Sequence, residues 1–201
     1  MLEISEAPRR IGVLDQLDPL PASDRIAIRV LPPEAHFTLR LAADDAARIS
    51  QIAGLSLTLP INRVRDVPPR LAARLGPDEW LLITAEADAE AFQAEAARAL
   101  AGCHHALVDI GHRNIAIEVV GPVAADILNA GCPLDFGLDR CSPGSATRTL
   151  FAKAEIILFR LADVAGERGG LVPRYRIECW RSFGRYVHGV LAEVAREYSA
   201  A

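Results

Sequence analysis

The 201-residue sequence has few cysteines, no long apolar run and no concentration of charge of one sign. Its four cysteines include no Cys-x-x-Cys pair, so we expect reduced thiols rather than disulfides or a reactive nucleophile. No apolar run approaches the ~20 residues that a membrane helix needs. The amino terminus, MLEISEAPRR, has acids and no apolar centre, which is not the pattern of a signal peptide. These absences predict a cytoplasmic protein with no membrane contact.

Charge is spread evenly along the chain. The formal net charge is −4, and the arginines are scattered among acidic residues without forming a basic stripe. A nucleic-acid or acidic-membrane partner is therefore not expected. Hydrophobic residues make up 51% of the sequence, which is enough to bury a sizeable core in one large domain or in two small, closely packed ones.

The loops and elbows of common catalytic sites are also missing. There is no Gly-x-Gly-x-x-Gly or Walker loop, and the glycines of AGERGG are expected in a turn because no helix follows them. Ser142 and Ser145 lack the strand-to-helix elbow that exposes a catalytic serine. We therefore expect no catalytic or cofactor-binding residues in this chain.

Residue types that bind metals occur together at His104, His105, Asp109 and His112. A metal site needs three or four converging ligands. If the segment is extended, His104 and Asp109 project to opposite faces. We therefore expect ordinary polar residues here and no metal site.

The segment from Leu107 to Phe136 contains a complete strand-turn-helix pattern. Ile115, Ile117 and Val119 alternate with more polar residues, which predicts a half-buried strand. Gly121 and Pro122 end that strand, and proline at a first helical position suits the start of a helix. The segment predicts a structural scaffold and carries no obvious catalytic set.

The elements come in the same order twice, which predicts an α+β fold. Residues 1–24 are expected as an extended arm that needs a surface to lie against, residues 25–104 as a first half, and residues 105–201 as a second half of one compact unit. Each half follows the order strand, helix, strands, helix, which favours helices covering a mainly antiparallel sheet. The expected strands are 25–31, 36–42, 79–84, 115–120 and 175–181; the expected helices are 44–53, 87–101, a short helix after Pro122, and 183–198; residues 147–161 are expected as one bent strand or a hairpin, and 59–69 mostly as a loop. Asp44 is the expected N-cap of the helix over 44–53.

Several motifs resemble the gamma subunit of heterotetrameric sarcosine oxidase. They are VDIGHRNIAIEVVGP, ILNAGCPLD, GSATRTLFAKAEIILFR and YRIECWRSFGRYVHGVLAE, supported by LGPDEWLLI, and the likeness covers roughly residues 36–198. The resemblance implies a fold related to the folate-binding aminomethyltransferase of the glycine cleavage system. It also implies a non-catalytic subunit with alpha, beta and delta partners, in a complex that demethylates sarcosine to glycine, forms hydrogen peroxide and passes a one-carbon unit to tetrahydrofolate. In that family FAD, FMN, NAD and tetrahydrofolate lie on the larger subunits, and zinc lies on the smallest.

One departure from the aminomethyltransferases bears on folate chemistry. Those proteins carry a glycine pair and an acidic pair at the tip of the long hairpin, whereas this chain has Lys153, Ala154 and Glu155 there. Independent folate chemistry is therefore not expected. A free-standing folate-binding one-carbon transfer protein or regulator remains an alternative, as does a homo-oligomeric scaffold.

An aromatic and basic cluster near the carboxyl end is the expected partner interface. Its members are Arg174, Arg176, Trp180, Arg181, Arg185 and Tyr186, with Phe183 among them. Arginine, tryptophan and tyrosine are enriched at protein interfaces. The same composition also suits a core rim, in which the aromatic rings are buried and the arginines are solvated.

Overall fold

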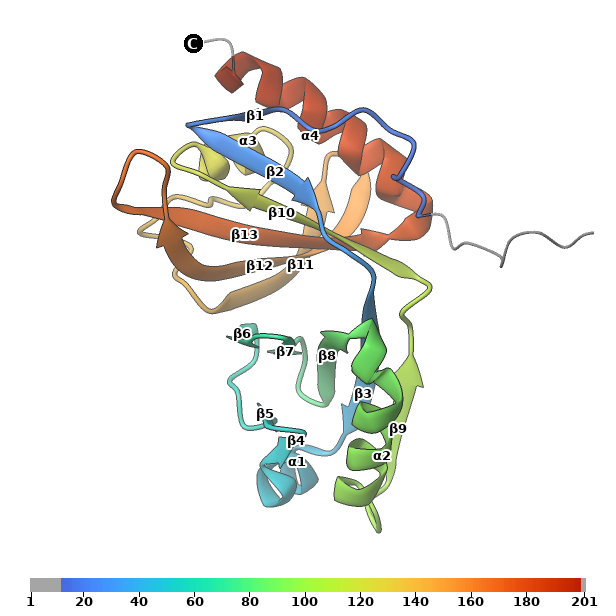
Figure 1. The fold of residues 1–201 in the computed structure, drawn as a ribbon. Coiled ribbons are helices and arrows are strands. Elements are labelled where there is room, and N and C mark those ends of the chain that lie inside the picture. Colours follow the sequence, from blue (N-terminus) through green and yellow to red (C-terminus); the bar gives the residue numbers. More distant parts are fainter. Residues whose placement is uncertain (1–11, 200–201) are drawn as a thin grey trace, which may run out of the picture.

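The computed structural model describes residues 12–199. The described chain forms an eleven-stranded sheet in the order β1-β2-β10-β13-β12-β11-β6-β7-β8-β3-β9, and all of its strand pairs are antiparallel. Figure 1 shows that the strands and helices form two units, one above the other. The predicted α+β class with a mainly antiparallel sheet is confirmed.

The first unit, at the bottom of Figure 1, runs from β3 through β9. Its elements are β3 (Glu34–Leu41), α1 (Ala43–Ile49), β4 (Gln51–Ile52), β5 (Leu55–Ser56), β6 (Arg63–Val67), β7 (Arg70–Arg74), β8 (Glu79–Ala85), a 3-10 turn (Glu86–Asp88), α2 (Ala89–Ala99) and β9 (His105–Asp109). The side chains of Phe37 and Leu39 point from β3 toward α2, where Phe92 stacks on Phe37 with ring centroids 5.0 Å apart. This face of the sheet is the first core.

The second unit holds the remaining strands and the longest helix. Its elements are β1 (Ala22–Ser23), β2 (Ile26–Val30), β10 (Asn114–Val120), α3 (Ala124–Asn129), β11 (Ser145–Phe151), β12 (Ala154–Ala165), β13 (Leu171–Trp180), a 3-10 turn (Arg181–Phe183) and α4 (Gly184–Ser199). The apolar stripe expected on the last helix is fully buried at Val187, Leu191 and Ala195. It packs with α3 against Ile117 and Ile177 of the sheet.

A third apolar cluster joins the two units. Strand side chains alternate between faces, so each sheet presents a second face on the side away from its helices. Val64, Leu81 and Ile83 of the first unit pack there against Phe159 and Leu161 of the second. One register pair, Ser145 opposite Arg63, also connects the sheets edge to edge.

The structure divides the chain differently from the expected halves. β2, expected in the first half, pairs with β10 of the second unit. β9, expected to open the second half, pairs with β3 of the first unit. The chain therefore crosses between units twice, through residues 31–33 and 110–113. Element order alone could not reveal this exchange, because pairing depends on contacts between distant residues.

Two local predictions were wrong. The helix expected over 44–53 ends at Ile49, and its N-cap is Ala42 with no side-chain cap, because Asp44 already lies within the helix. The stretch 59–69, expected mostly as loop, contains β6, which pairs with β7. The peptide bond between Pro68 and Pro69 is cis and sits in the turn between these strands. The segment 147–161 forms the hairpin of β11 and β12, which is the second of the two predicted alternatives and not one bent strand.

The described part of the amino-terminal arm packs on its own chain. Leu14 and Leu20 are buried in the core of the second unit. The surface that residues 12–24 pack against is therefore part of the same chain. The rest of the predicted arm, residues 1–11, lies outside the described residues.

Candidate functional site

The two crossings between units lie next to each other and frame the candidate site. The backbone N–H of Ile110 donates to the carbonyl oxygen of His36 at 2.7 Å, and the N–H of Leu31 donates to that of Ala116 at 2.9 Å. These bonds hold the end of β2 and the start of β3 against the segment that leads into β10 (Figure 1). These bonds fix the backbone at the junction, where polar side chains of the two units face each other.

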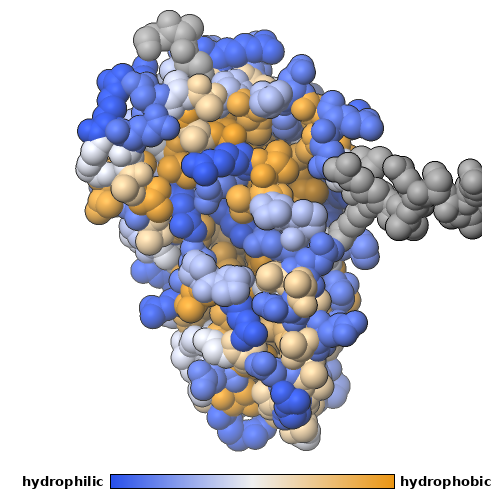
Figure 2. Space-filling model, viewed as in Figure 1, coloured by the Kyte–Doolittle hydropathy of each residue, from blue (hydrophilic) through white to orange (hydrophobic). Residues whose placement is uncertain are grey.

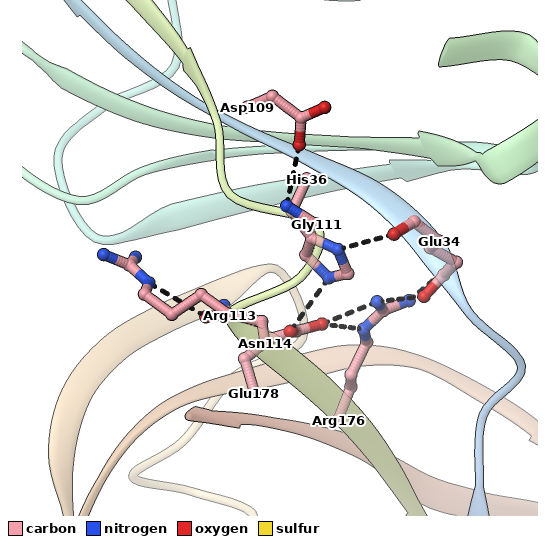
Figure 3. A network of polar contacts seen from close by, with 8 residues as sticks. All are labelled: Glu34, His36, Asp109, Gly111, Arg113, Asn114, Arg176 and Glu178. Atoms are coloured by element: carbon pink, nitrogen blue, oxygen red, sulfur yellow. Dashed lines mark hydrogen bonds and ion pairs between the residues drawn. The ribbon is translucent and has the colours of Figure 1, made fainter. Parts of the chain in front are cut away.

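Four side chains form what we call the junction cluster: the half-buried Glu34 and the buried His36 of β3, and the buried Arg176 and Glu178 of β13 (Figure 3). The guanidinium of Arg176 donates to Glu178 Oε1 from Nε at 2.8 Å and from Nη2 at 2.6 Å. It also donates to both carboxylate oxygens of Glu34, at 3.2 and 2.5 Å. His36 Nε2 lies 3.0 Å from Glu178 Oε2, and neither atom has another partner. His36 Nδ1 lies 3.0 Å from the carbonyl oxygen of Glu34.

The charged groups of the cluster shift one another's pKa values. Burial alone would raise the pKa of Glu178, but the charges of His36 and Arg176 outweigh it and hold that pKa at about 2. Burial likewise opposes the charged form of His36, yet the facing Glu178 carboxylate raises its pKa above 6.5. The pKa of Arg176 is raised against the effect of burial by Glu178 and Glu34. Arg176, joined by His36 when it is protonated, therefore faces the carboxylates of Glu34 and Glu178 between the units.

A metal ion is a poor fit for this cluster. The ligand atoms of Glu34, His36 and Glu178 lie within 4.8 Å of one another, and among the described residues no other group of metal-binding types converges in this way. The guanidinium of Arg176, however, bonds to both carboxylates and occupies the space beside them. A divalent cation would sit against that positive charge, so the geometry favours an ion-pair cluster.

Further ion pairs cross the same interface. Arg174 of β13 bonds to Asp66 of β6, and its Nε lies 3.3 Å from Glu118 of β10. Arg148 of β11 bonds to Glu79 of β8, with one donor-to-acceptor distance of 3.1 Å. The Arg174–Asp66 and Arg148–Glu79 pairs therefore add polar contacts between the units to the apolar one.

The residues of the predicted partner interface fall into two groups, one bound within the chain and one exposed. The side chain of Arg176 is 8% exposed and that of Arg174 is 23% exposed, and both bind carboxylates of their own chain. We correct their assignment, because they hold the two units together instead of facing outward. Trp180, Arg185 and Tyr186 are exposed, and Arg181 is half-buried. These four lie where β13 turns into α4.

Trp180 is the centre of that exposed group. It is 45% exposed, and its ring stacks on Phe183 with centroids 6.2 Å apart. The guanidinium of Arg113 lies over the ring, 5.6 Å from its centroid. Arg113 Nε donates to Asn114 Oδ1 at 3.3 Å, and Figure 3 shows its guanidinium directed away from the junction cluster. Arg113 was not among the residues predicted from the sequence.

Two hollows flank the junction. The first, of about 370 Å³, is mainly apolar and is lined by residues 12–15 and 30–34 with His36, His112, Ile115 and Arg181. The second, of about 380 Å³, is more polar and lies between the units beside Trp180. The residues that line it include Arg40, Glu79 and Arg148 together with Arg113 and Glu155. Arg40 and Arg148 share the carboxylate of Glu79.

The residues set aside in the sequence are found in ordinary structural roles. His104 and His105 are exposed, and Asp109 Oδ1 accepts a bond from the N–H of Gly111 at 2.8 Å. The AGERGG glycines form the turn between β12 and β13, and all four cysteines are free thiols. The hairpin of β11 and β12 turns at residues 152–153, where Ala152 has a φ of 52°.

Glu34, His36 and Glu178 were missed, and Arg176 was assigned to a partner interface, because Glu34 and Arg176 are 142 positions apart. One signal was available. Arg174, Arg176 and Glu178 alternate along β13 with Tyr175 and Ile177, so one face of a central strand is charged. A charged face in the middle of a sheet requires partners from another element.

Two antiparallel units with outer helices and an ion-paired junction define a protein of the aminomethyltransferase-like fold. Aminomethyltransferase T of the glycine cleavage system from Bartonella henselae matches with a TM-score of 0.63 at 13% identity, over 83% of this chain and 45% of that chain. More specifically, the chain belongs to the sarcosine oxidase gamma subunit family, whose model matches residues 41–193. A chain of the heterotetrameric sarcosine oxidase from Corynebacterium sp. U-96 matches with a TM-score of 0.79 at 24% identity, over 96% of this chain and 97% of that one.

Two negative observations accompany these matches. No curated protein matches the sequence. None of the helices among residues 12–199 is long and apolar enough to cross a membrane.

Proposed function

We propose that this chain is the non-catalytic gamma subunit of a heterotetrameric sarcosine oxidase, bound to alpha, beta and delta subunits. In that role it supports the oxidative demethylation of sarcosine to glycine on its partners, together with formation of hydrogen peroxide and methylene-tetrahydrofolate. The observation that carries the proposal is the family match over residues 41–193, together with a fold that agrees over nearly the whole chain with one chain of such a complex.

The state of the polar groups supports a structural role for the isolated chain. In the junction cluster each charged side chain is already bound to an opposite charge of the same chain. Groups held in this way stabilise a fold but offer no free acid, base or nucleophile to a substrate. We therefore place FAD, FMN, NAD, tetrahydrofolate and zinc on the partner subunits, and propose that the isolated chain has no oxidase activity.

The exposed end of β13 is the proposed contact with the partners. Trp180, Arg185 and Tyr186 are exposed there beside the half-buried Arg181, in the composition that protein interfaces favour. On the face seen in Figure 2, apolar residues are most frequent over the second unit, while hydrophilic residues dominate the first. The free thiols agree with a cytoplasmic location, which we also propose.

Co-expression tests the proposal directly. The chain and the alpha, beta and delta subunits are produced together, with an affinity tag on the alpha subunit only. Retention of this chain at one copy per complex is expected. A complex that forms and oxidises sarcosine with this chain left in the flow-through would contradict the proposal.

A folate titration separates the proposal from the alternative function. The aminomethyltransferase-like fold raises the possibility of direct folate binding by this chain. Calorimetric titration of the purified chain with tetrahydrofolate should give no saturable heat. Micromolar binding would favour the free-standing one-carbon transfer protein.

A further inference from the structure

The surface around Trp180 has features that point to one kind of partner. We propose that it binds an acidic segment of one of the larger subunits, with a carboxylate on Arg113 and apolar side chains on the indole ring. The Trp180 surface comprises Arg113, Leu150, Lys153, Glu155, Trp180 and Tyr186. The inference rests on the proposed function and adds the chemistry of the partner.

The topology brings these residues to one end of the second unit. β11 and β13 end there, at Phe151 and Trp180, while β10 and β12 begin there, at Asn114 and Ala154. Leu150 is the register partner of Glu155 on β11 and β12. Glu155 and Trp180 both line the hollow of about 380 Å³. The surface is therefore continuous across neighbouring strands and opens onto a recess.

The apolar part of the surface is large and is held in place. Leu150 is 48% exposed and Tyr186 is 40% exposed, beside the half-exposed ring of Trp180. The indole ring stacks on Phe183, and the guanidinium of Arg113 lies over it, so both groups hold it in place. The hydroxyl oxygen of Tyr186 accepts a bond from the backbone N–H of Lys153 at 3.3 Å. Aromatic side chains fixed before binding lose little entropy when a partner covers them.

The charges of the surface select an acidic partner. Arg40 and Arg148, which also line the recess, are both paired with Glu79. Arg113 and Lys153 have no carboxylate within 4.0 Å among residues 12–199, and the exposed Arg185 beside Tyr186 has none either. Glu155 is the one carboxylate of the surface, and it has no ion pair with a described residue. Cations without a partner therefore outnumber carboxylates, and a partner's acidic side chain would complement them.

A second copy of this chain fits the surface less well than a different protein. A twofold dimer through this surface would bring together the Arg113 and Lys153 cations of both copies, four in all, against only the two Glu155 carboxylates. Like charges brought together in this way oppose association. An acidic segment meets no such repulsion, and its apolar neighbours can cover the ring.

Chemical cross-linking within the assembled complex tests the proposed partner chemistry. Lys153 is the only lysine in the sequence, so a carbodiimide that joins an amine to a carboxylate marks this position uniquely among the side chains. We expect an amide between Lys153 and an aspartate or glutamate of a larger subunit, identified by mass spectrometry. The K153R variant keeps the charge and should lose only this cross-link.

Assembly of variants tests the energetic importance of the surface. The variants W180A and R113E are each co-expressed with the other three subunits, and release of this chain is measured as the complex is diluted. We expect the concentration at half-release to rise by at least about tenfold, because exposed tryptophan and arginine anchors carry much of the binding energy of interfaces. Two matched controls, L171A at the other end of β13 and R98E on α2, should stay within about twofold of the wild type, because both side chains are exposed away from this surface.

The outcomes separate the inference from the proposed function. Wild-type assembly with both W180A and R113E retained like the controls would overturn the inference whatever the cross-linking result, and the proposed function would stand. Wild-type assembly with Lys153 coupled to no acidic residue of a partner would also count against the inference. Failure of the wild-type chain to assemble would overturn both.

Discussion

Replacing Arg176 by methionine should strongly destabilise the protein, because this guanidinium binds the fully buried carboxylate of Glu178 and the half-buried carboxylate of Glu34. The side chain of Glu178 is 0% exposed and that of Glu34 is 19% exposed. Methionine fills a similar length without a charge or a donor. The variant R176M would leave Glu34 without its cation and Glu178 with His36 as its only counter-charge.

The size of the effect follows from the burial. Removing one partner of a buried ion pair costs about 3–5 kcal/mol, because an uncompensated charge remains in the interior. The whole stability of a domain is only about 5–15 kcal/mol, so this single change should remove a large part of it. The loss should be smaller if His36, whose pKa is already raised by Glu178, keeps its proton and takes over part of the compensation.

Urea unfolding of the chain at neutral pH measures this loss. The sequence has two tryptophans, Trp80 buried in the first unit and Trp180 half-exposed in the second, so fluorescence reports on both. The control is R196M, which breaks a surface pair with Glu193 and should cost about 0.5 kcal/mol or less. A loss for R176M below about 1 kcal/mol, or no larger than the control, would refute the assignment of the junction cluster as a structural lock.

Four other perturbations give separate tests. Because the folded pKa of His36 is raised, the stabilisation that it provides is full below pH 6.5 and is lost as pH rises through the folded value; H36Q should therefore flatten the alkaline side of the stability profile measured by urea unfolding. The pKa of Glu178 is lowered from 4.5 to about 2, so its contribution should be lost as pH falls through that range, and E178Q should show a shallower acid limb in the same measurement. Gly121 has a φ of 146°, and a Cβ there would lie 2.2 Å from the carbonyl oxygen of Arg25; G121A should lower the unfolding free energy by more than about 2 kcal/mol, and an unchanged urea midpoint would show that β2 can move away. Burial raises the pKa of the Cys179 thiol to about 12, so alkylation by iodoacetamide at pH 8 should be at least about tenfold slower in the folded chain than in urea, as followed by mass spectrometry.

The local elements were largely predictable from the sequence. Periodicity placed the strand containing Ile117 and the final helix with its stripe at Val187, Leu191 and Ala195, because the same alternation that marks a strand or a helix decides which side chains are buried. The β6–β7 hairpin was hidden by Pro68 and Pro69, which break the pattern at the turn between its strands.

The pairing of distant segments was not predictable in the same way. β2 leaves its sequence neighbours to pair with β10, and β9 stays with β3, so the boundary between units does not follow the order of the elements. The two units meet through the sheet faces that no helix covers, where residues such as Phe159 and Ile83 pack together. The pairing of the strands depends on this contact. No short motif encodes that contact.

The candidate site was predicted in part. Trp180, Arg185 and Tyr186 were singled out by composition and are exposed. Composition could not separate them from Arg176, because an arginine on a strand has the same sequence signature whether its partner is solvent, another chain or a glutamate 142 positions away. Arg113, between β9 and β10, carried no signal of its own.

The most direct test of the central claim is to isolate the chain from its natural source under gentle conditions and to identify its companions. An affinity tag is placed on this chain at its chromosomal locus, and the purified material is analysed by mass spectrometry, size-exclusion chromatography and visible absorption. We expect one particle that contains this chain with three different subunits, absorbs as a flavoprotein and oxidises sarcosine. Recovery of the chain alone, as a monomer or homo-oligomer without flavin absorption, would contradict it.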